Sequence, residues 1–463
     1  MSARLRQFPR RAAAAFRGEN LKARAARSSF WTIAGTLSQQ FLRLASNLIL
    51  TRILFPEAFG LMAIVQVFLT GLQMFSDMGI RASIVQNDRS DEPGFLNTAW
   101  TLQIIRGVVL WLISCAIAWP IAQFYEQPLL AWMMPVVGLT ALISGFYPTR
   151  IHTMSRDLKI GLVTRINVAT QVVGIVAMVI LALILENVWA LVIGALIAEL
   201  AKLWALLHFL PGMRNRLAFD RSSSAELIHF GKWIFISTAC TFLVNNADRA
   251  LLGKFISLDL LGIYSIGFFL ANAPLLLARP MVNNVVFPLY KQRSPWKSEE
   301  NRKKISSMRR KVTAGLFAMS AVLAILGDWL VGVLYDPRYA LAGPIVVLMT
   351  VALMPRQIVI SYGGLLLAAG DSLRFMIFMV SAAVINTTAL VIGIRTLGVA
   401  GAVIAPGISY ILIYPLIAVF AHRYKGLDLR NDALFFGLGL VISALALWLN
   451  LDAVQELFAI GRS

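Results

Sequence analysis

Polar side chains recur at helical spacing along residues 29–50, an apolar segment long enough to cross a membrane. At ~100° per residue, one arc of the helix surface about 100° wide holds Thr32, Thr36, Gln39, Arg43, Ser46 and Asn47. An arginine near the bilayer centre costs ~2.5–3.5 kcal/mol and is normally tolerated where it faces a bundle interior or a water-filled cavity. The guanidinium fork suits phosphate and carboxylate groups. The stripe therefore predicts an anion-binding cavity lined by Gln39, Arg43 and Asn47, with Arg52 just beyond; snorkelling or a buried ion pair is the alternative.

Further charged residues fall inside other apolar segments. Arg106 lies near the middle of one, Arg356 directly follows Pro355, and Arg249 stands at the end of a third. We assign these three arginines to the same cavity. Three acids are candidates for proton or cation coupling, with a simple ion pair as the alternative for each: Asp77, Asp248 and Asp328. Arg165, Lys202 and Lys232 lie near segment ends, where snorkelling to the membrane surface is the better interpretation.

The elements that carry these residues are membrane-spanning helices. The chain has 463 residues, of which 58% are hydrophobic and 14% charged, whereas a soluble domain is about 25% charged. The sequence predicts an all-α integral membrane protein with 12–14 transmembrane helices. Thirteen spans are predicted, at 29–50, 58–80, 97–120, 129–149, 160–184, 187–208, 230–247, 258–279, 312–334, 341–369, 373–394, 399–420 and 433–450. A fourteenth segment, 451–461, is too short to span alone.

The net charge of +19 reports topology rather than a nucleic-acid partner. With the N-terminus in the cytoplasm, lysine and arginine favour the cytoplasmic segments by roughly five to one. The first 28 residues are interpreted as a basic cytoplasmic arm. The basic loop 280–311 has the charge density of a nucleic-acid or lipid-headgroup patch, and a topology-setting loop beside anionic membrane lipids is the favoured interpretation.

Two stretches of the chain are similar to each other. Residues 47–69 and 245–270 pair Arg52 with Arg249, Glu57 with Asp259 and Gly60 with Gly262. The similarity is weak, but its register predicts two six-helix lobes in the same orientation, a known transporter plan. We expect an N-lobe at 29–210, a C-lobe at 211–425 and additional C-terminal span or spans at 426–463.

Motifs for catalysis or cofactor binding are absent from the sequence. No Gly-x-x-x-x-Gly-Lys-Ser/Thr motif occurs, so the chain carries no recognisable ATPase loop. The four histidines have no mutual metal-ligand spacing, and Cys115 and Cys240 are interpreted as inert core residues. We expect a protein that is not an enzyme, with no cofactor and no metal, driven by an ion gradient or by downstream use of its substrate.

Residues 46–86, SNLILTRILFPEAFGLMAIVQVFLTGLQMFSDMGIRASIVQ, resemble the start of bacterial polysaccharide transporters, the Wzx-like lipid-linked oligosaccharide flippases of the MATE-like exporter superfamily. The matching elements are Thr51–Arg52, Pro56–Gly60 and Ser76–Gly79. The second half fits too, through NNADRALLGKF at 245–255 and VVFPLYKQ at 285–292. The resemblance implies two lobes around a central cationic cavity.

The resemblance also implies a function and partners. It implies movement of undecaprenyl-diphosphate-linked oligosaccharide repeat units across the bacterial inner membrane by alternating access, for exopolysaccharide, O-antigen or capsule synthesis. A polysaccharide polymerase and export machinery would be partners. Three alternatives stay open: a flippase for the peptidoglycan lipid precursor, a small-molecule or cation antiporter, and a membrane polymerase or ligase. The last would be expected to carry a large outward loop, and we find none.

Overall fold

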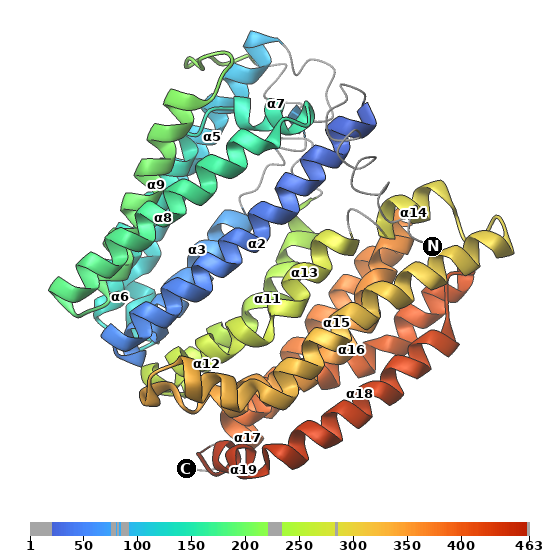
Figure 1. Cartoon of the computed structure of the whole chain (residues 1–463). Coiled ribbons are helices and arrows are strands. Elements are labelled where there is room, and N and C mark those ends of the chain that lie inside the picture. The colour runs from blue at the N-terminus through green and yellow to red at the C-terminus, as the bar shows by residue number, and fades with distance from the viewer. Residues whose placement is uncertain are drawn as a thin grey trace, which may run out of the picture. The chain divides into compact units, whose positions relative to one another are not determined.

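The computed structural model describes residues 21–75, 80, 83–84, 92–220, 234–282 and 286–460. Its regular elements within these ranges are helices (Figure 1). The chain divides into two compact units. Unit 1 comprises Met1–Ile53 and Leu69–Phe235, and unit 2 comprises Leu54–Phe68 and Ile236–Ser463.

Unit 1 is built from long packed helices. They are α2 (Leu21–Ile53), the end of α3 (Pro56–Phe75), α5 (Pro93–Phe124), α6 (Leu129–Gly145), the short α7 (Arg150–Arg156), α8 (Ile160–Leu185) and α9 (Trp189–Phe209). Helix α5 packs on α6, α6 on α9, α9 on α8, and α8 on α2. Small residues allow the close approach: Gly107 of α5 meets the backbone of α6 at Ala141 and Gly145.

Unit 2 is arranged around one buried helix. Its elements are α11 (Ile234–Phe255), α12 (Leu258–Ala271), α13 (Ala273–Met281), α14 (Phe287–Gln292), α15 (Glu299–Leu334), the 3₁₀ turn η3 (Pro337–Tyr339), α16 (Ala342–Ala368), α17 (Ser372–Arg423), α18 (Leu429–Leu449) and α19 (Leu451–Ile460). Helix α16 contacts α12, α14, α15, α17, α18 and α19 (Figure 1), and most of its residues are buried. Its mainly apolar sequence fits this position, because most of its described residues face other helices.

The described parts of the predicted spans fall on helices, although the single span predicted at 258–279 is divided between α12 and α13. Among the described residues, eight helices are long and apolar enough to cross a membrane, or nine if the bent pair α6–α7 counts as one span. Helices α2 and α11 do not pass that test, and they carry many of the predicted polar site residues. The spans predicted at 373–394 and 399–420 form one element, α17, which turns back at Gly398 with φ 57°. Helix α19 has 10 residues, which is too short to span.

Two glycines that the sequence pairs lie in contact in unit 2. A Cβ added to Gly60 would overlap the carbonyl oxygen of Leu258, and one added to Gly262 would overlap the carbonyl oxygen of Pro56. Pro56 stands four residues before Gly60, and Leu258 stands four before Gly262. The contact is therefore reciprocal, as expected for two equivalent turns related by an approximate two-fold axis.

Candidate functional site

Two of the predicted arginines meet in unit 2 on a single asparagine. Arg356 of α16 donates from Nη2 to Asn245 Oδ1 at 2.8 Å. Arg249, one turn further along α11, donates from Nη2 to the main-chain oxygen of Asn245 at 3.0 Å and to Asn246 Oδ1 at 3.1 Å. Because a carboxamide and a carbonyl are neutral, neither contact cancels the arginine charge. We call Asn245, Asn246, Asp248, Arg249 and Arg356 the arginine cluster.

Asp248, the acid of this cluster, does not form a close ion pair with Arg249. Asp248 is 6% exposed and accepts a hydrogen bond from Tyr264 Oη of α12 at 2.7 Å. Its other oxygen lies 3.9 Å from Arg249 Nε, too far for a hydrogen bond. Arg249 Nε is buried and has no hydrogen-bond partner among the described residues. Asp248 therefore compensates only part of the charge of two arginines.

Aromatic rings hold the two guanidinium groups in place. The Arg249 guanidinium carbon lies 4.5 Å from the ring centre of Phe268 on α12. That of Arg356 lies 5.3 Å from the ring of Tyr410 on α17. A ring at such a distance attracts the cation and helps to orient the guanidinium. Helix α16 runs through Pro355 as one helix and places Arg356 beside α11 and α17.

Arg106 occupies a different site, a pocket within unit 1 of about 440 Å³. Arg106 donates from Nη2 to the main-chain oxygen of Gln73 at 2.7 Å. The pocket wall also includes Gln103, Tyr147, Glu199 and Lys202. Gln103 donates from Nε2 to the main-chain oxygen of Tyr147 at 3.1 Å, which ties α5 to the turn after α6.

The sequence reasoning missed most of this pocket. Tyr147 Oη donates to a Glu199 carboxylate oxygen, and Lys202 Nζ lies 4.8 Å from the centre of the Tyr147 ring. Lys202 thus lines the pocket beside an aromatic ring, and its predicted snorkelling stays a prediction. The i, i+3 spacing of Glu199 and Lys202 is the only signal in the sequence, and it is equally typical of a solvent-facing pair.

No residue of the polar stripe of α2 is among the described residues that line the unit 1 pocket. Helix α2 packs on α8, and the Gln171 Nε2 of α8 donates to the main-chain oxygen of Gln39 at 3.0 Å. Arg43 and Arg52 are exposed, while Gln39 and Asn47 are half-buried. The main-chain oxygen of Asn47 accepts a hydrogen bond from Thr51 Oγ1 at 2.8 Å. A common cavity for the stripe and the other arginines stays a prediction.

The three acids predicted as coupling groups do not form one group among the described residues. Asp248 belongs to the arginine cluster. Asp328 is half-buried on α15, against Gly343 of α16, where its carboxylate occupies the space that a larger side chain at 343 would need. Asp77 lies outside the described residues. Within the described part of the chain, no group of His, Cys, Asp and Glu is placed to hold a metal ion.

Comparisons with known proteins agree on a polysaccharide pathway. The sequence model of a family described as polysaccharide biosynthesis protein matches residues 49–342. Teichuronic acid biosynthesis protein TuaB of Bacillus subtilis is 23% identical over 64% of this chain and 62% of its own length, so the match spans less than two thirds of that relative. Succinoglycan biosynthesis transport protein ExoT of Rhizobium meliloti is 22% identical over 89% of this chain and 82% of its own.

Solved transporters share the fold. The lipid II flippase MurJ, in an inward closed conformation, superposes with a TM-score of 0.71 at 12% identity, over 94% of this chain and 98% of its own. A multidrug resistance MATE family transporter superposes with a TM-score of 0.61 at 12% identity, over 90% of this chain and 98% of its own. These likenesses establish the fold of a multi-pass, all-helical membrane transporter. The match to the family's sequence model covers more than half of this chain, so the chain belongs to the polysaccharide biosynthesis protein family.

Proposed function

We propose that this protein is a flippase for undecaprenyl-diphosphate-linked oligosaccharide repeat units in exopolysaccharide, O-antigen or capsule synthesis. Membership of the family and the transporter fold support a transport protein that handles lipid-linked oligosaccharide rather than an enzyme. The arginine cluster is the observation that favours an anionic cargo. It holds two arginines whose hydrogen-bond acceptors are mostly neutral, against one carboxylate.

A diphosphate matches the chemistry of this cluster. Two guanidinium forks can each bind one phosphoryl group through paired N–H donors. The amide of Asn245 holds Arg356 while the cargo is absent, and the exchange of a neutral acceptor for a charged one favours binding. Five further polar residues are proposed to contact the cargo along its path: Gln39, Arg43, Asn47, Arg52 and Arg106. Asp248 and Asp328 are proposed coupling groups, as is Asp77.

The location and the partners follow from the same proposal. The protein would reside in the bacterial inner membrane, with its N-terminus in the cytoplasm, as the distribution of lysine and arginine favours. The two lobes at 29–210 and 211–425 would alternate the access of the cargo to the two membrane faces. A polysaccharide polymerase and export machinery would act on the cargo after it reaches the outer leaflet.

A flippase for the peptidoglycan lipid precursor is the second candidate. The observation that favours it is the superposition with the lipid II flippase, which has the higher TM-score of the two solved structures compared above. At 12% identity this likeness reports the fold alone. The family match and the named relatives favour the polysaccharide cargo.

Deletion of the gene, followed by mass spectrometry of the lipid-linked intermediates, tests the proposal. In the deletion strain we expect a completed diphosphate-linked repeat unit to accumulate on the cytoplasmic side of the membrane. Complementation with the wild-type gene should abolish this accumulation. Arg249→Ala and Arg356→Ala should fail to complement at normal protein levels. Arg395→Ala is the matched control, because Arg395 is an exposed arginine outside the cluster, and it should complement fully.

Other outcomes would overturn the proposal. Accumulation of the peptidoglycan precursor would favour the second candidate. Repeat units that reached the outer leaflet but stayed unpolymerised would indicate a polymerase or ligase. Unchanged intermediates would indicate a small-molecule antiporter. Full complementation by both alanine variants would remove the arginine cluster from the transport path.

A further inference from the structure

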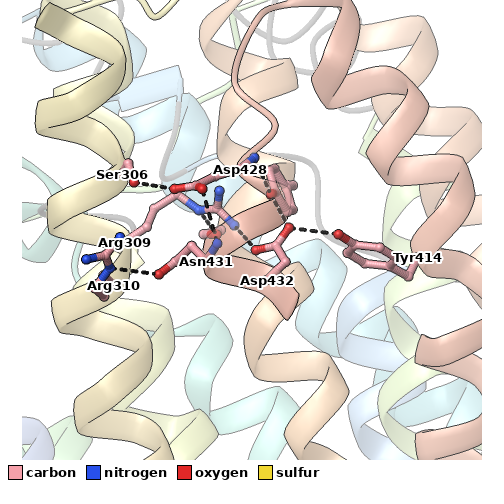
Figure 2. Close-up of polar contacts among 9 residues, drawn as sticks. Ser306, Arg309, Arg310, Tyr414, Asp428, Asn431 and Asp432 are labelled. Carbon is pink, nitrogen blue, oxygen red and sulfur yellow. Dashed lines mark hydrogen bonds and ion pairs between the residues drawn. The ribbon is translucent and has the colours of Figure 1, made fainter. Parts of the chain in front are cut away.

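A buried ion pair at one end of unit 2 fixes the start of α18 to three other helices (Figure 2). Arg309 of α15 and Asp432 of α18 are 2% and 1% exposed, and Arg309 Nη2 lies 3.1 Å from Asp432 Oδ1. Asp432 Oδ2 also accepts hydrogen bonds from Tyr362 of α16 and, at 2.9 Å, from Tyr414 of α17. Arg309 Nε donates to Ser361 Oγ at 2.9 Å. We call these residues the hub; it joins four helices, α15, α16, α17 and α18.

A second layer of contacts fixes the loop between α17 and α18 against α15. Ser306 of α15 donates to Asp428, which also accepts from the backbone N–H of Asn431 and so caps α18. Arg310 Nε donates to Asn431 Oδ1 at 3.1 Å (Figure 2). The loop therefore has a defined position beside the basic first turns of α15.

Two adjoining clefts, which we call the basic groove, lie beside this loop. They have volumes of about 570 and 640 Å³ and share the walls formed by Pro295, Glu299, Arg302, His422 and Leu427. Apart from Arg309, seven basic side chains line them: Lys297, Arg302, Lys303, Arg310, Arg423, Lys425 and Arg430.

The two carboxylates of the groove are already engaged. Glu299 lies 3.0 Å from Arg302, and Asp428 is held by Ser306 and by the N-terminus of α18. The groove therefore has a surplus of positive charge that no acid in its wall neutralises. Such a concave, single-sign surface concentrates anions.

The basic groove lies where a membrane surface meets the helix ends. Arg310 lies two residues before the predicted span 312–334, Arg430 lies three before the span 433–450, and Arg423 lies three after the span 399–420. Trp296 packs edge-to-face on Tyr424 beside it, with ring centres 5.8 Å apart. Tryptophan and tyrosine are enriched at the level of lipid headgroups. A ligand in the groove would thus sit at headgroup depth.

We propose that the basic groove binds the headgroup of an anionic phospholipid with two phosphate groups, one in each of the adjoining clefts. Basic pockets between transmembrane helices on the cytoplasmic side suit such headgroups. The occupant belongs to the surrounding membrane and not to the transported cargo. The site is separate from the arginine cluster of α11 and α16, and it lies on helix ends that the buried hub holds rigid. The proposal therefore stands whether or not the cargo is a polysaccharide unit.

Native mass spectrometry of the purified full-length protein with added cardiolipin tests this site. We expect the wild type to retain one tightly bound cardiolipin, and to retain phosphatidylglycerol, with its single phosphate, more weakly. Near a membrane surface each removed Lys or Arg weakens the binding of an anionic lipid about fivefold. The affinity for cardiolipin should therefore fall on the order of 100-fold in the triple variant Arg302→Gln/Lys425→Gln/Arg430→Gln. Lys304→Gln is the matched control, because Lys304 lies on the same turns of α15, pairs with Glu300 and lines neither cleft.

The thermal unfolding midpoint without added lipid shows whether the triple variant is folded, and a value equal to wild type is expected because all three residues are exposed. Unchanged cardiolipin retention by the triple variant would overturn the proposal. So would an equal loss in Lys304→Gln, which would indicate overall charge and not a built site. Tighter binding of undecaprenyl diphosphate than of cardiolipin would assign the groove to the cargo.

Discussion

Replacement of Asp432 by alanine should destabilise unit 2 more than a typical substitution does. Among the described residues, the change removes the only carboxylate that contacts the buried Arg309, and it removes the acceptor for the hydroxyls of Tyr362 and Tyr414 (Figure 2). Arg309 would keep one neutral acceptor, Ser361, and a tyrosine ring 3.8 Å from its guanidinium carbon. At 2% exposure the arginine cannot be solvated in place.

The expected loss is about 3–5 kcal/mol of unfolding free energy, the usual cost of leaving one charge of a buried pair without its partner. The assay is reversible unfolding in mixed micelles titrated with SDS and followed by tryptophan fluorescence. Glu300→Gln is the control. It breaks an ion pair with Lys304 on the same helix, but both side chains are exposed, so no measurable change is expected.

The double variant Arg309→Met/Asp432→Leu separates the cost of an unpaired charge from the loss of the pair itself. Apolar residues of similar volume often replace a buried pair without loss of stability. We therefore expect the double variant to be more stable than Asp432→Ala. A loss below about 1 kcal/mol for Asp432→Ala would refute the reasoning, because it would mean that Arg309 finds solvent. A double variant as unstable as the single one would show that the hydrogen bonds of the tyrosines dominate.

Three further predictions follow from the described contacts. Gly262→Ala should block folding or transport, because the added Cβ overlaps the carbonyl oxygen of Pro56, whereas Gly332→Ala enters open space and should have no effect on protein yield or complementation. Arg356→Lys keeps the charge but loses the planar fork, so it should reduce transport of a diphosphate cargo about tenfold or more in vesicles, and wild-type rates would exclude bidentate binding. Tyr424 and Arg374 hold the pKa of Asp371 at about 2, below its ordinary ~3.9. The stabilisation from the lowered pKa is complete above the unfolded pKa and is lost as the pH falls through the folded pKa, so the Tm advantage over Asp371→Asn should be constant from pH 7 to 5 and shrink between about pH 4 and 2. An advantage at pH 2 as large as at pH 7 would refute the assignment.

The fold was predictable because apolar segments report membrane helices directly. The described parts of the predicted spans fall on helices, and the two glycines paired by the weak internal similarity, Gly60 and Gly262, lie in contact regions of the same kind. The sequence did not show that 373–394 and 399–420 would pack as a tight hairpin. That contact depends on the left-handed backbone of Gly398 and on the close approach of Gly393 to Gly401, both local features without a hydropathy signal.

Residues of the candidate site could be predicted only where placing a single charged side chain inside the membrane is energetically costly. Arg249 and Arg356 stood out because arginine is expensive at membrane depth. Tyr147 and Glu199 did not stand out, because their pairing joins positions 52 residues apart. Arg309 was hidden among the many charges of 291–311, and its partner lies 123 residues further along the chain. Such partners are set by the packing of helices and not by local sequence.

The degree of compensation separates two uses of arginine in unit 2. Arg309 has a buried carboxylate, a hydroxyl and a stacked ring around it, so its charge is fully committed to holding helix ends together. Arg249 and Arg356 have mainly neutral acceptors, and the nearest carboxylate to Arg249 stands 3.9 Å away because a tyrosine holds its other oxygen. An anion that entered this cluster would gain two charge-assisted partners without breaking a strong ion pair. For this reason the arginine cluster is suited to reversible binding of cargo, whereas the Arg309–Asp432 hub is suited to fixing the helices around it.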